Sequence, residues 1–210
     1  MARIKAQGGQ LKIATGTGGA KTITGVTKAY PAVVTSAGHA LVAGNRVTIA
    51  SVGGMTELNG NTYTIEYTTT NTFALKGVDS TGYGAYTSGG TATPVTFTKV
   101  ARSKVINLGG GTASELDGTD LDSVAKEFEG GLPDYGEASG EVFTDFLDGG
   151  QDAVRARYAD QASVDFQIVY IDGTVAAFTG FIKSYEESSA VDSFVGSNLT
   201  IRKTGATTWT

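Results

Sequence analysis

The stretch that decides the fold is residues 164–185, VDFQIVYIDGTVAAFTGFIKSY. Val164, Phe166, Ile168 and Tyr170 alternate with the polar Asp165 and Gln167, which is the two-residue period of a strand with one buried face. The Asp-Gly pair at 172–173 is typical of a tight hairpin turn, and residues 175–185 then predict a returning strand. Residues 194–203, FVGSNLTIRK, predict a third strand. Together these segments predict an antiparallel β-meander.

The composition favours strands along the whole chain. Its 210 residues include 30 glycines, 3 prolines and no cysteine, and abundant glycine with little proline favours strands joined by tight turns. A chain of this length buries about two-thirds of its surface on folding, so it needs no disulfide to form a core. We expect a soluble protein made in the cytoplasm, since the first residues lack the apolar run of a signal peptide and no segment is long enough to span a bilayer.

One helix interrupts the strands. Residues 148–160, DGGQDAVRARYAD, place a capping aspartate at Asp148 and Gln151 three residues later, which is the spacing of a capping box. Val154 and Tyr158 lie one helical turn apart and predict a buried stripe. The helix is short and contains two glycines, so we expect it to pack against a sheet.

Residues 25–93 differ in composition from the rest and predict a small inserted all-β domain. Short runs of β-branched and aromatic residues lie between turn signals, at 46–52, 62–67 and 72–76. The remaining residues, 1–24 and 94–210, then form one discontinuous domain. We expect that domain to be a β-sandwich or half-open barrel with the helix packed against it.

A carboxylate-rich segment at 109–140 predicts a long loop between strands. A connection of this length in a compact β domain is either functional or disordered. Its apolar residues are too frequent for a solvated linker, so we expect the loop to dock on another surface. These apolar residues are Leu116, Leu121, Val124, Phe128, Leu132 and Tyr135.

Charge is unevenly distributed along the chain. The formal net charge is -5, but residues 1–24 are purely basic and the acidic excess lies in residues 94–210. A basic arm and an acidic body can attract copies of the chain head to tail, although a basic terminus is also compatible with simple solvation. The basic N-terminal arm comprises Arg3, Lys5 and Lys12.

The motifs of the chain do not support catalysis or a cofactor. His39 is the only histidine and has no obvious catalytic partner, so we expect it in a surface loop. The run ATGTGGAKT at 14–22 departs from a phosphate loop, because Ala20 replaces the glycine before the lysine and no helix follows. The loop acids lack the spacing of an EF-hand, although calcium binding there stays open. We therefore expect no enzyme activity, no cofactor and no metal site.

Three segments together resemble the tail tube (major tail) proteins of long-tailed bacteriophages, especially those with non-contractile tails. They are ELDGTDLDSVAKEFEGGLPDYGEASGE at 115–141, DGGQDAVRARY at 148–158, and GFIKSYEESSAVDSFVGSNLTIRKTGATTW at 180–209. The family's acidic loop, Lys-Glu-Phe run and Gly-Leu-x-Asp-x-Gly-Glu run are matched at 117–122, 126–128 and 131–137. The resemblance covers residues 94–210 well and residues 1–24 loosely.

The resemblance implies a structural virion protein of the phage tail. Such proteins form hexameric rings that stack into a hollow tube, through which viral DNA passes without specific binding. Tail terminator, tail-tip and tape measure proteins are the implied partners. The acidic loop would contact neighbouring copies through Glu115, Asp117, Asp120, Leu121, Asp122, Phe128, Leu132, Pro133 and Tyr135.

The 25–93 segment departs from the minimal family pattern. It is similar to small β modules appended to various phage tail proteins, and we expect it to project from the tube exterior, because inside the tube it would block the channel. Tyr83 and Tyr86 lie in a glycine-rich part of this segment. They motivate an alternative function, a carbohydrate- or protein-binding β module of the adhesin type, although rings of this kind more often cover the end of a very small core. A hydrolase that uses the acidic loop is a third hypothesis.

Overall fold

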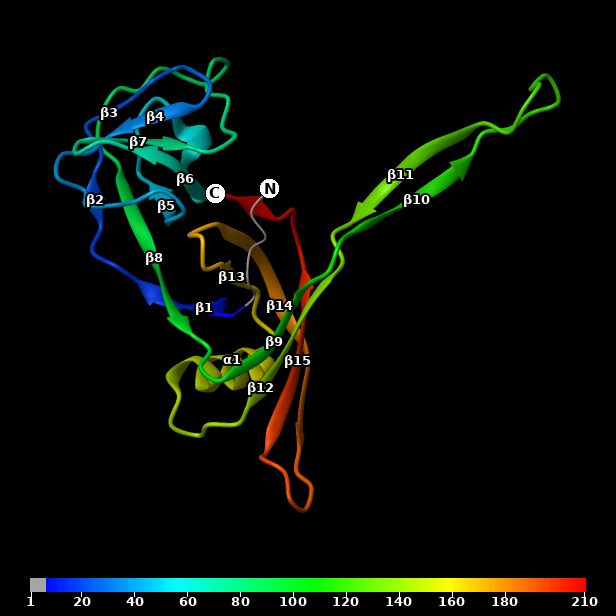
Figure 1. Ribbon diagram of the computed structural model, residues 1–210. Helices are drawn as coiled ribbons and strands as arrows, with labels where there is room; N and C mark the ends of the chain where they lie inside the picture. Colours follow the sequence, from blue (N-terminus) through cyan, green and yellow to red (C-terminus); the bar gives the residue numbers. More distant parts are fainter. Residues whose placement is uncertain (1–6) are drawn as a thin grey trace. The chain divides into compact units, whose positions relative to one another are not determined.

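The computed structural model describes residues 7–210, and the described chain is mainly β, as predicted (Figure 1). One α-helix, α1 (Gly149–Asp160), and a 3-10 helix at Thr56–Leu58 interrupt the strands. The strands are β1 (Gln10–Thr17), β2 (Lys21–Thr22), β3 (Gly25–Val26), β4 (Ala32–Thr35), β5 (Arg46–Ala50), β6 (Thr62–Thr68), β7 (Thr72–Leu75), β8 (Thr91–Lys99), β9 (Ser103–Leu108), β10 (Thr112–Asp117), β11 (Phe128–Asp134), β12 (Glu137–Phe143), β13 (Val164–Val169), β14 (Val175–Ser188), β15 (Gly196–Lys203) and β16 (Thr208–Trp209).

The chain divides into two structural units. Unit 1 contains the described residues up to Lys99 together with Gln167–Ala177 and Thr208–Thr210. Unit 2 contains Val100–Phe166 and Phe178–Thr207. Strands β13 and β14 therefore contribute residues to both units. Within unit 1 the strand order is β3-β4-β7-β6-β5-β8-β1, and within unit 2 it is β14-β15-β12-β9.

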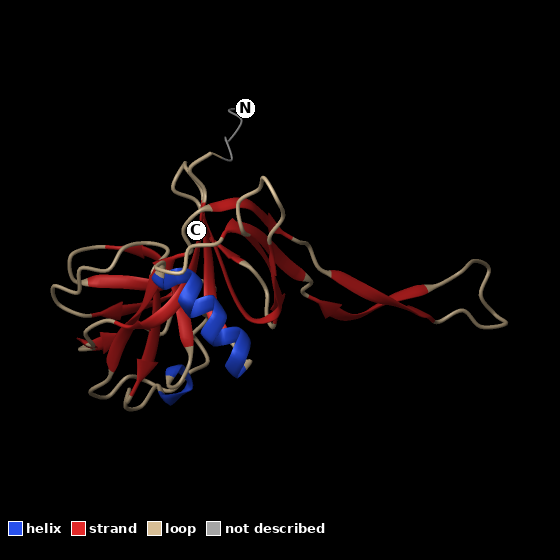
Figure 2. Ribbon diagram, turned by 90° about the horizontal axis from the view of Figure 1, so that it is seen from below, coloured by secondary structure: helices blue, strands red, loops and turns tan. Residues whose placement is uncertain are grey.

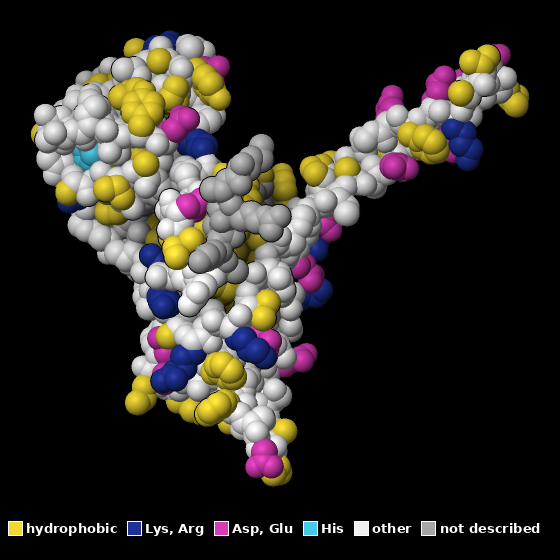
Figure 3. Space-filling view, in the orientation of Figure 1, with side chains coloured by type: hydrophobic (Ala, Val, Ile, Leu, Met, Phe, Trp, Pro, Cys, Tyr) yellow, Lys and Arg dark blue, Asp and Glu magenta, His cyan; other side chains and the backbone are white. Residues whose placement is uncertain are grey.

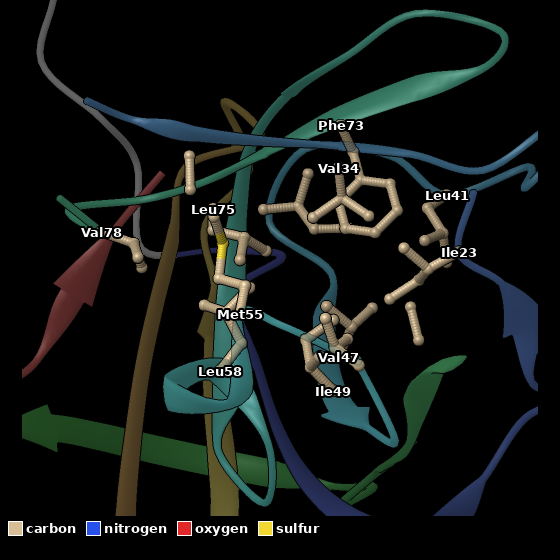
Figure 4. Close-up of a cluster of buried hydrophobic side chains, with 14 residues drawn as sticks. Ile23, Val34, Leu41, Val47, Ile49, Met55, Leu58, Phe73, Leu75 and Val78 are labelled. Carbon is tan, nitrogen blue, oxygen red and sulfur yellow. The ribbon is translucent and has the colours of Figure 1, made fainter. Parts of the chain in front are cut away.

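Unit 1 has an apolar core whose members all come from residues 23–92. The strands predicted at 46–52, 62–67 and 72–76 are present as β5, β6 and β7, and each pairs antiparallel with its neighbours. Figure 4 shows the side chains of this cluster converging. The buried members are Ile23, Ala32, Val34, Leu41, Val47, Ile49, Val52, Met55, Leu58, Ile65, Phe73, Leu75, Val78 and Ala92.

The prediction that His39 lies on the surface is wrong. The imidazole is buried, and its ring packs edge-on against Phe73 at a centroid distance of 5.2 Å. Its Nδ1 accepts a hydrogen bond from the Leu41 amide at 2.9 Å, and its Nε2 lies 3.2 Å from the Thr72 carbonyl oxygen. Both ring nitrogens are therefore used within the fold, and His39 is a structural residue.

The tyrosines behind the adhesin hypothesis are not displayed on a free loop. Tyr83 and Tyr86 are half-buried and pack against the unit 1 core. The Tyr86 hydroxyl lies 3.2 Å from the Ile23 carbonyl oxygen and 3.1 Å from that of Gly89. The rings therefore cover the edge of the core, which removes the feature that motivated the alternative function.

The predicted meander is present. Gly173 adopts φ +89° in the turn between β13 and β14, a conformation that only glycine adopts easily, and β15 pairs antiparallel with β14. The alternation in β13 fails at Gln167, which is buried like its neighbours Phe166 and Ile168. Burial of this amide is compatible with folding because its Nε2 donates to the Gly44 carbonyl oxygen at 3.1 Å.

The predicted helix is also present, with two differences. Asp148 caps it as expected, accepting from the Gln151 amide at 2.8 Å. The Gln151 side chain does not complete a capping box, because it bonds to the backbone of other segments. Val154 is buried, but Tyr158 is half-exposed beside Tyr185, so the predicted two-residue stripe is wrong at Tyr158. Among residues 7–210, no helix combines the length and apolar character needed to cross a membrane.

The segment at 109–140 is not a loop, which corrects the prediction. It forms the strands β10 and β11 and the first part of β12 (Figure 2). Strands β10 and β11 pair with each other in a separate two-stranded sheet. Alternation is weak here because the segment has no buried face, so a pattern of period two does not arise.

Candidate assembly surfaces

The arm, defined here as residues 109–136, continues the β9–β12 hairpin beyond the edge of the unit 2 sheet. Leu108 pairs with Ala138 in that hairpin, and the Gly109 amide donates to the Glu137 carbonyl oxygen at 3.0 Å. Gly136 adopts φ +74°, and a Cβ there would lie 2.0 Å from the Gly110 carbonyl oxygen. Only glycine fits this position, so the sequence itself directs the chain from the sheet into the arm.

Two basic residues of β15 hold the base of the arm. Arg202 Nη2 donates to Asp134 Oδ2 at 2.8 Å, and the largely buried Lys203 Nζ donates to the Gly109 carbonyl oxygen at 2.6 Å. Hydrogen bonds from the Gly136 amide and from Arg202 hold the pKa of Asp134 below its ordinary range. Burial lowers the pKa of Lys203, and nearby Asp134 opposes that change. These contacts with β15 therefore fix the base of the arm where it extends from the unit 2 sheet.

Beyond its base the arm is unsupported on both faces. Every residue of β10 is exposed, and in β11 only Gly131 is partly covered. Leu116 pairs with Glu129, whereas Phe128 pairs with Asp117, so the two apolar side chains lie on opposite faces of the ribbon. A two-stranded hairpin is marginally stable in water by itself, and this one also exposes apolar side chains on both faces.

The tip of the arm, residues 118–127, is an ordered turn. The Gly118 amide donates to the Glu127 carbonyl oxygen at 3.0 Å and closes the ladder. Within the turn, Asp120 Oδ1 accepts from the Asp122 amide at 3.0 Å and from the Ser123 hydroxyl at 3.1 Å. The turn is thus fixed by its own polar groups, and its apolar side chains are left free.

Two apolar side chains project from this turn. Leu121 and Val124 are fully exposed, at 105% and 104% of their reference areas. The arm carries seven carboxylates and one lysine, Lys126. Figure 3 shows acidic and apolar side chains interspersed along it. Over residues 7–210, no group of three or more His, Cys, Asp or Glu is placed to hold a metal ion, and this includes the acids for which calcium was considered.

A second apolar surface lies at the other end of the β9–β12 ladder. It is a groove of about 500 Å³, built where β9 begins and β12 ends, and we call it the aromatic groove. The rings of Phe143 and Phe194 meet edge to face there, with centroids 5.6 Å apart. Its lining residues are Arg102, Phe143, Thr144, Phe146, Phe194 and Val195.

Gln151 of α1 positions the walls of this groove. Its Oε1 accepts from the Asp145 amide at 2.9 Å. Its Nε2 donates to the carbonyl oxygens of Ala101 and Phe143, at 3.0 and 2.9 Å. One buried side chain therefore links the helix to the segments on both sides of the groove.

Cationic side chains surround the aromatic groove. Arg102 Nε donates to Asp145 at 2.8 Å, and this hydrogen bond, with that of the Leu147 amide, lowers the pKa of Asp145. Lys104 Nζ lies 5.9 Å from the ring centroid of Phe143, and the Arg155 guanidinium lies 5.4 Å from that of Phe146. Each of these cations also pairs with a carboxylate: Arg102 with Asp145, Lys104 with Glu141 and Arg155 with Asp152. The groove thus has an aromatic floor surrounded by ion pairs.

All of the predicted contact residues fall in the arm. They divide between β10 (Glu115, Asp117), the tip (Asp120, Leu121, Asp122), β11 (Phe128, Leu132, Pro133) and the connection to β12 (Tyr135). Of the basic N-terminal arm, Arg3 and Lys5 lie outside the described residues, and Lys12 lies in β1 opposite Lys99.

The aromatic groove was not among the sites predicted from the sequence. The strand predicted at 194–203 would include Phe194, but β15 begins at Gly196, and Phe146 lies beyond the end of β12 at Phe143. The sequence does contain a signal for it, since Phe143 and Phe146 lie five and two residues before the helix cap at Asp148. A strand end followed by exposed aromatic residues indicates a contact surface.

The arm and the groove both lie within a region that matches a known family. A family model described as lambda phage tail tube protein matches residues 81–210, which is more than half of the chain. The chain belongs to this family. This tail tube protein is a structural component of the virion tail, and the resemblance to phage tail tube proteins is confirmed.

Other comparisons are more limited. A second family model, the ubiquitin-activating enzyme E1 FCCH domain, matches residues 30–96 of the tail tube protein. Two solved structures are similar to it. One is a chain in the virion of a native gene transfer agent particle, with 19% identity and a TM-score of 0.47, covering 54% of this chain and 88% of the other. The second is a chain in the tail of an empty gene transfer agent particle, computed with helical refinement and C6 symmetry. It has 20% identity and a TM-score of 0.46, and the match covers 54% of this chain and 86% of the other. Comparison with curated proteins gave no match.

Proposed function

We propose that this tail tube protein assembles into hexameric rings, that the rings stack into the hollow tube through which viral DNA passes, and that the arm is the contact between neighbouring copies. One observation supports the role of the arm above the others. The arm is a two-stranded ribbon with apolar side chains on both faces, and the described part of its own chain does not cover them. A ribbon of this kind gains stability when another surface covers it.

Family membership supports the rest of the assembly. Sideways contacts that close after six copies limit a ring, whereas top-to-bottom contacts that never close extend a tube. An interface made by many arms in a ring would bury several thousand Å² and be effectively permanent. The acidic excess of the chain suits a lumen that repels phosphates, so that DNA slides without binding. Tail terminator, tail-tip and tape measure proteins are the partners that this role implies.

We also propose that residues 25–93 form an inserted module on the outside of the tube. The buried cluster of unit 1 is drawn from residues 23–92 and supports a core for that segment. The match of residues 30–96 to a separate family model supports the same boundary. An exterior position leaves the channel open for DNA.

The decisive experiment changes the tip of the arm. We expect the double substitution Leu121→Asp and Val124→Asp to leave a folded, soluble monomer, because both side chains are fully exposed in the monomer and the change costs it little. Negative-stain microscopy and light scattering report assembly, and circular dichroism reports folding. The matched control is Ile171→Asp, an exposed apolar residue of the β13–β14 turn in unit 1. Normal tubes from the double variant would contradict the role of the arm.

A further inference from the structure

We propose that the aromatic groove of one copy receives the arm tip of the next copy, with Leu121 and Val124 packed against the phenylalanine rings. This inference rests on the proposed function and names the surface that the arm binds. Three observations about unit 2 carry it. They concern shape and apolarity, hydrogen bonding at the rim of the groove, and the positions of the two surfaces on one ladder.

The first observation is that the two surfaces fit in shape and polarity. The tip is a small ordered turn with two apolar side chains on its outside, held by hydrogen bonds from Asp120. The groove is an apolar concavity of about 500 Å³ with Phe146 and Phe194 largely exposed at its edge. An ordered turn that enters a preformed groove loses little conformational entropy, which favours a specific contact.

The second observation is the free hydrogen-bonding capacity of Arg102 at the rim of the groove, which suits the acidic tip. The tip places carboxylates beside its apolar side chains, at Asp120, Asp122 and Glu127. The cations around the groove, Arg102, Lys104 and Arg155, each pair with one carboxylate, so the groove's rim is balanced in charge while the tip has an excess of acid. Arg102 is 61% exposed and uses one N–H for Asp145, so its guanidinium can also donate to an incoming carboxylate. Apolar groups would thus meet at the centre of the contact, and a tip carboxylate would accept from Arg102 at its rim.

The third observation, the position of the arm and the groove on one ladder, indicates that the groove binds the tip of another copy. Strands β9 and β12 form one antiparallel ladder, in which the arm continues from Leu108 and Glu137 and the groove lies beside Arg102 and Phe143. The arm and the groove therefore occupy opposite ends of the same ladder, and the tip of a chain points away from its own groove. Complementary surfaces at opposite ends make a head-to-tail contact between copies, and such a contact repeats along an open stack.

Cysteine cross-linking tests this contact directly, because the chain has no cysteine. We expect a Leu121→Cys protein mixed with a Val195→Cys protein to give a chain-to-chain cross-link with a short bismaleimide during assembly. Val195 lines the groove, and its substitution leaves the three phenylalanines in place. The control pairs Leu121→Cys with Ile171→Cys, which is exposed on unit 1. We expect the groove pair to give at least tenfold more cross-linked dimer than the control pair.

A groove variant separates this inference from the proposed function. Phe146 is exposed in the monomer, so Phe146→Asp should fold and yet fail to form tubes. Normal tubes from Phe146→Asp, with the Leu121→Asp and Val124→Asp variant still monomeric, would overturn the groove and leave the arm as the contact. Normal tubes from both variants would overturn the proposed function as well. Loss of tubes without the cross-link to Val195→Cys would also overturn the groove as the binding site of the tip.

Discussion

Replacement of Gln151 by alanine should both destabilise unit 2 and disable the aromatic groove. The side chain is 1% exposed and bonds three backbone groups, those of Asp145, Ala101 and Phe143. Alanine cannot reach any of them. The variant leaves one amide and two carbonyl groups without their partner, next to a surface where Arg102 and Phe143 must keep their positions.

The magnitude follows from the number of groups left unpaired. Each buried polar group that loses its partner costs about 1–3 kcal/mol. At the lower end of that range, three groups give a loss of about 3 kcal/mol in the free energy of unfolding, or roughly a 100-fold change in the folding equilibrium. For a chain of this size, about 3 kcal/mol corresponds to a fall in Tm of about 6–12 °C.

Scanning calorimetry measures this loss if assembly is prevented. We would compare Gln151→Ala with its parent in the background of Leu121→Asp and Val124→Asp, which we expect to remain monomeric. Gln7→Ala is the matched control, because Gln7 is an exposed glutamine whose loss should change stability by less than about 0.5 kcal/mol. In the unmodified background, Gln151→Ala should also reduce tube formation below its Tm. A fall in Tm no larger than that of the control would refute the reasoning that this amide holds the groove together.

Other predictions concern the arm base, pH, the inserted segment and the lumen. Gly136→Ala should reorient the arm and abolish tubes, because its φ is +74° and its new Cβ would meet the Gly110 oxygen, whereas Gly149→Ala has open space and should assemble normally. In an NMR titration the Asp134 carboxyl should have a midpoint below the ordinary value of about 3.9, and Arg202→Met should raise it. The lowered pKa belongs to the folded state, so the ionised Asp134 carboxyl stabilises the arm base fully at pH values above the ordinary pKa of about 3.9. That stabilisation is lost as the pH falls through the folded pKa. A midpoint at or above about 3.9 would count against the contacts of Asp134 with Gly136 and Arg202. Joining Thr24 to Pro94 through a short linker should still give tubes, and a folded deletion variant that stays monomeric would show that residues 25–93 are needed for assembly. A structure of the assembled tube should show an acidic lumen, and a basic lumen would exclude free sliding of DNA.

Much of the fold was determined by local chemistry that a sequence shows directly. The meander could be predicted because β13 and β14 join through a turn whose Gly173 supplies positive φ. The helix could be predicted because Asp148 caps it with its own side chain. The segments at 46–52, 62–67 and 72–76 became strands whose apolar side chains, β-branched in the first two and Phe73 and Leu75 in the third, face the core of unit 1. These features depend on residues close together in the chain, so the local pattern is sufficient.

The tertiary structure decided the features that join distant residues. Gln151 has the spacing of a capping box, but carbonyl groups at Ala101 and Phe143 provide partners that the sequence does not reveal. Gln167 is buried against Gly44, more than a hundred residues away, for the same reason. His39 is buried because the Thr72 carbonyl and Phe73 enclose it.

The arm and the aromatic groove, the two candidate assembly surfaces, also differ in what the sequence predicted and what only the tertiary structure decided. The sequence by itself determined that the 109–136 segment is rich in acidic and apolar residues, because composition alone measures those properties, and from this we predicted that it docks on another surface. It did not reveal that the segment is a two-stranded arm, since a ribbon exposed on both faces has no buried side to create alternation. Only the tertiary structure brought Phe143, Phe146 and Phe194 together, because the pairing of β12 with β15 places residues about fifty positions apart beside each other.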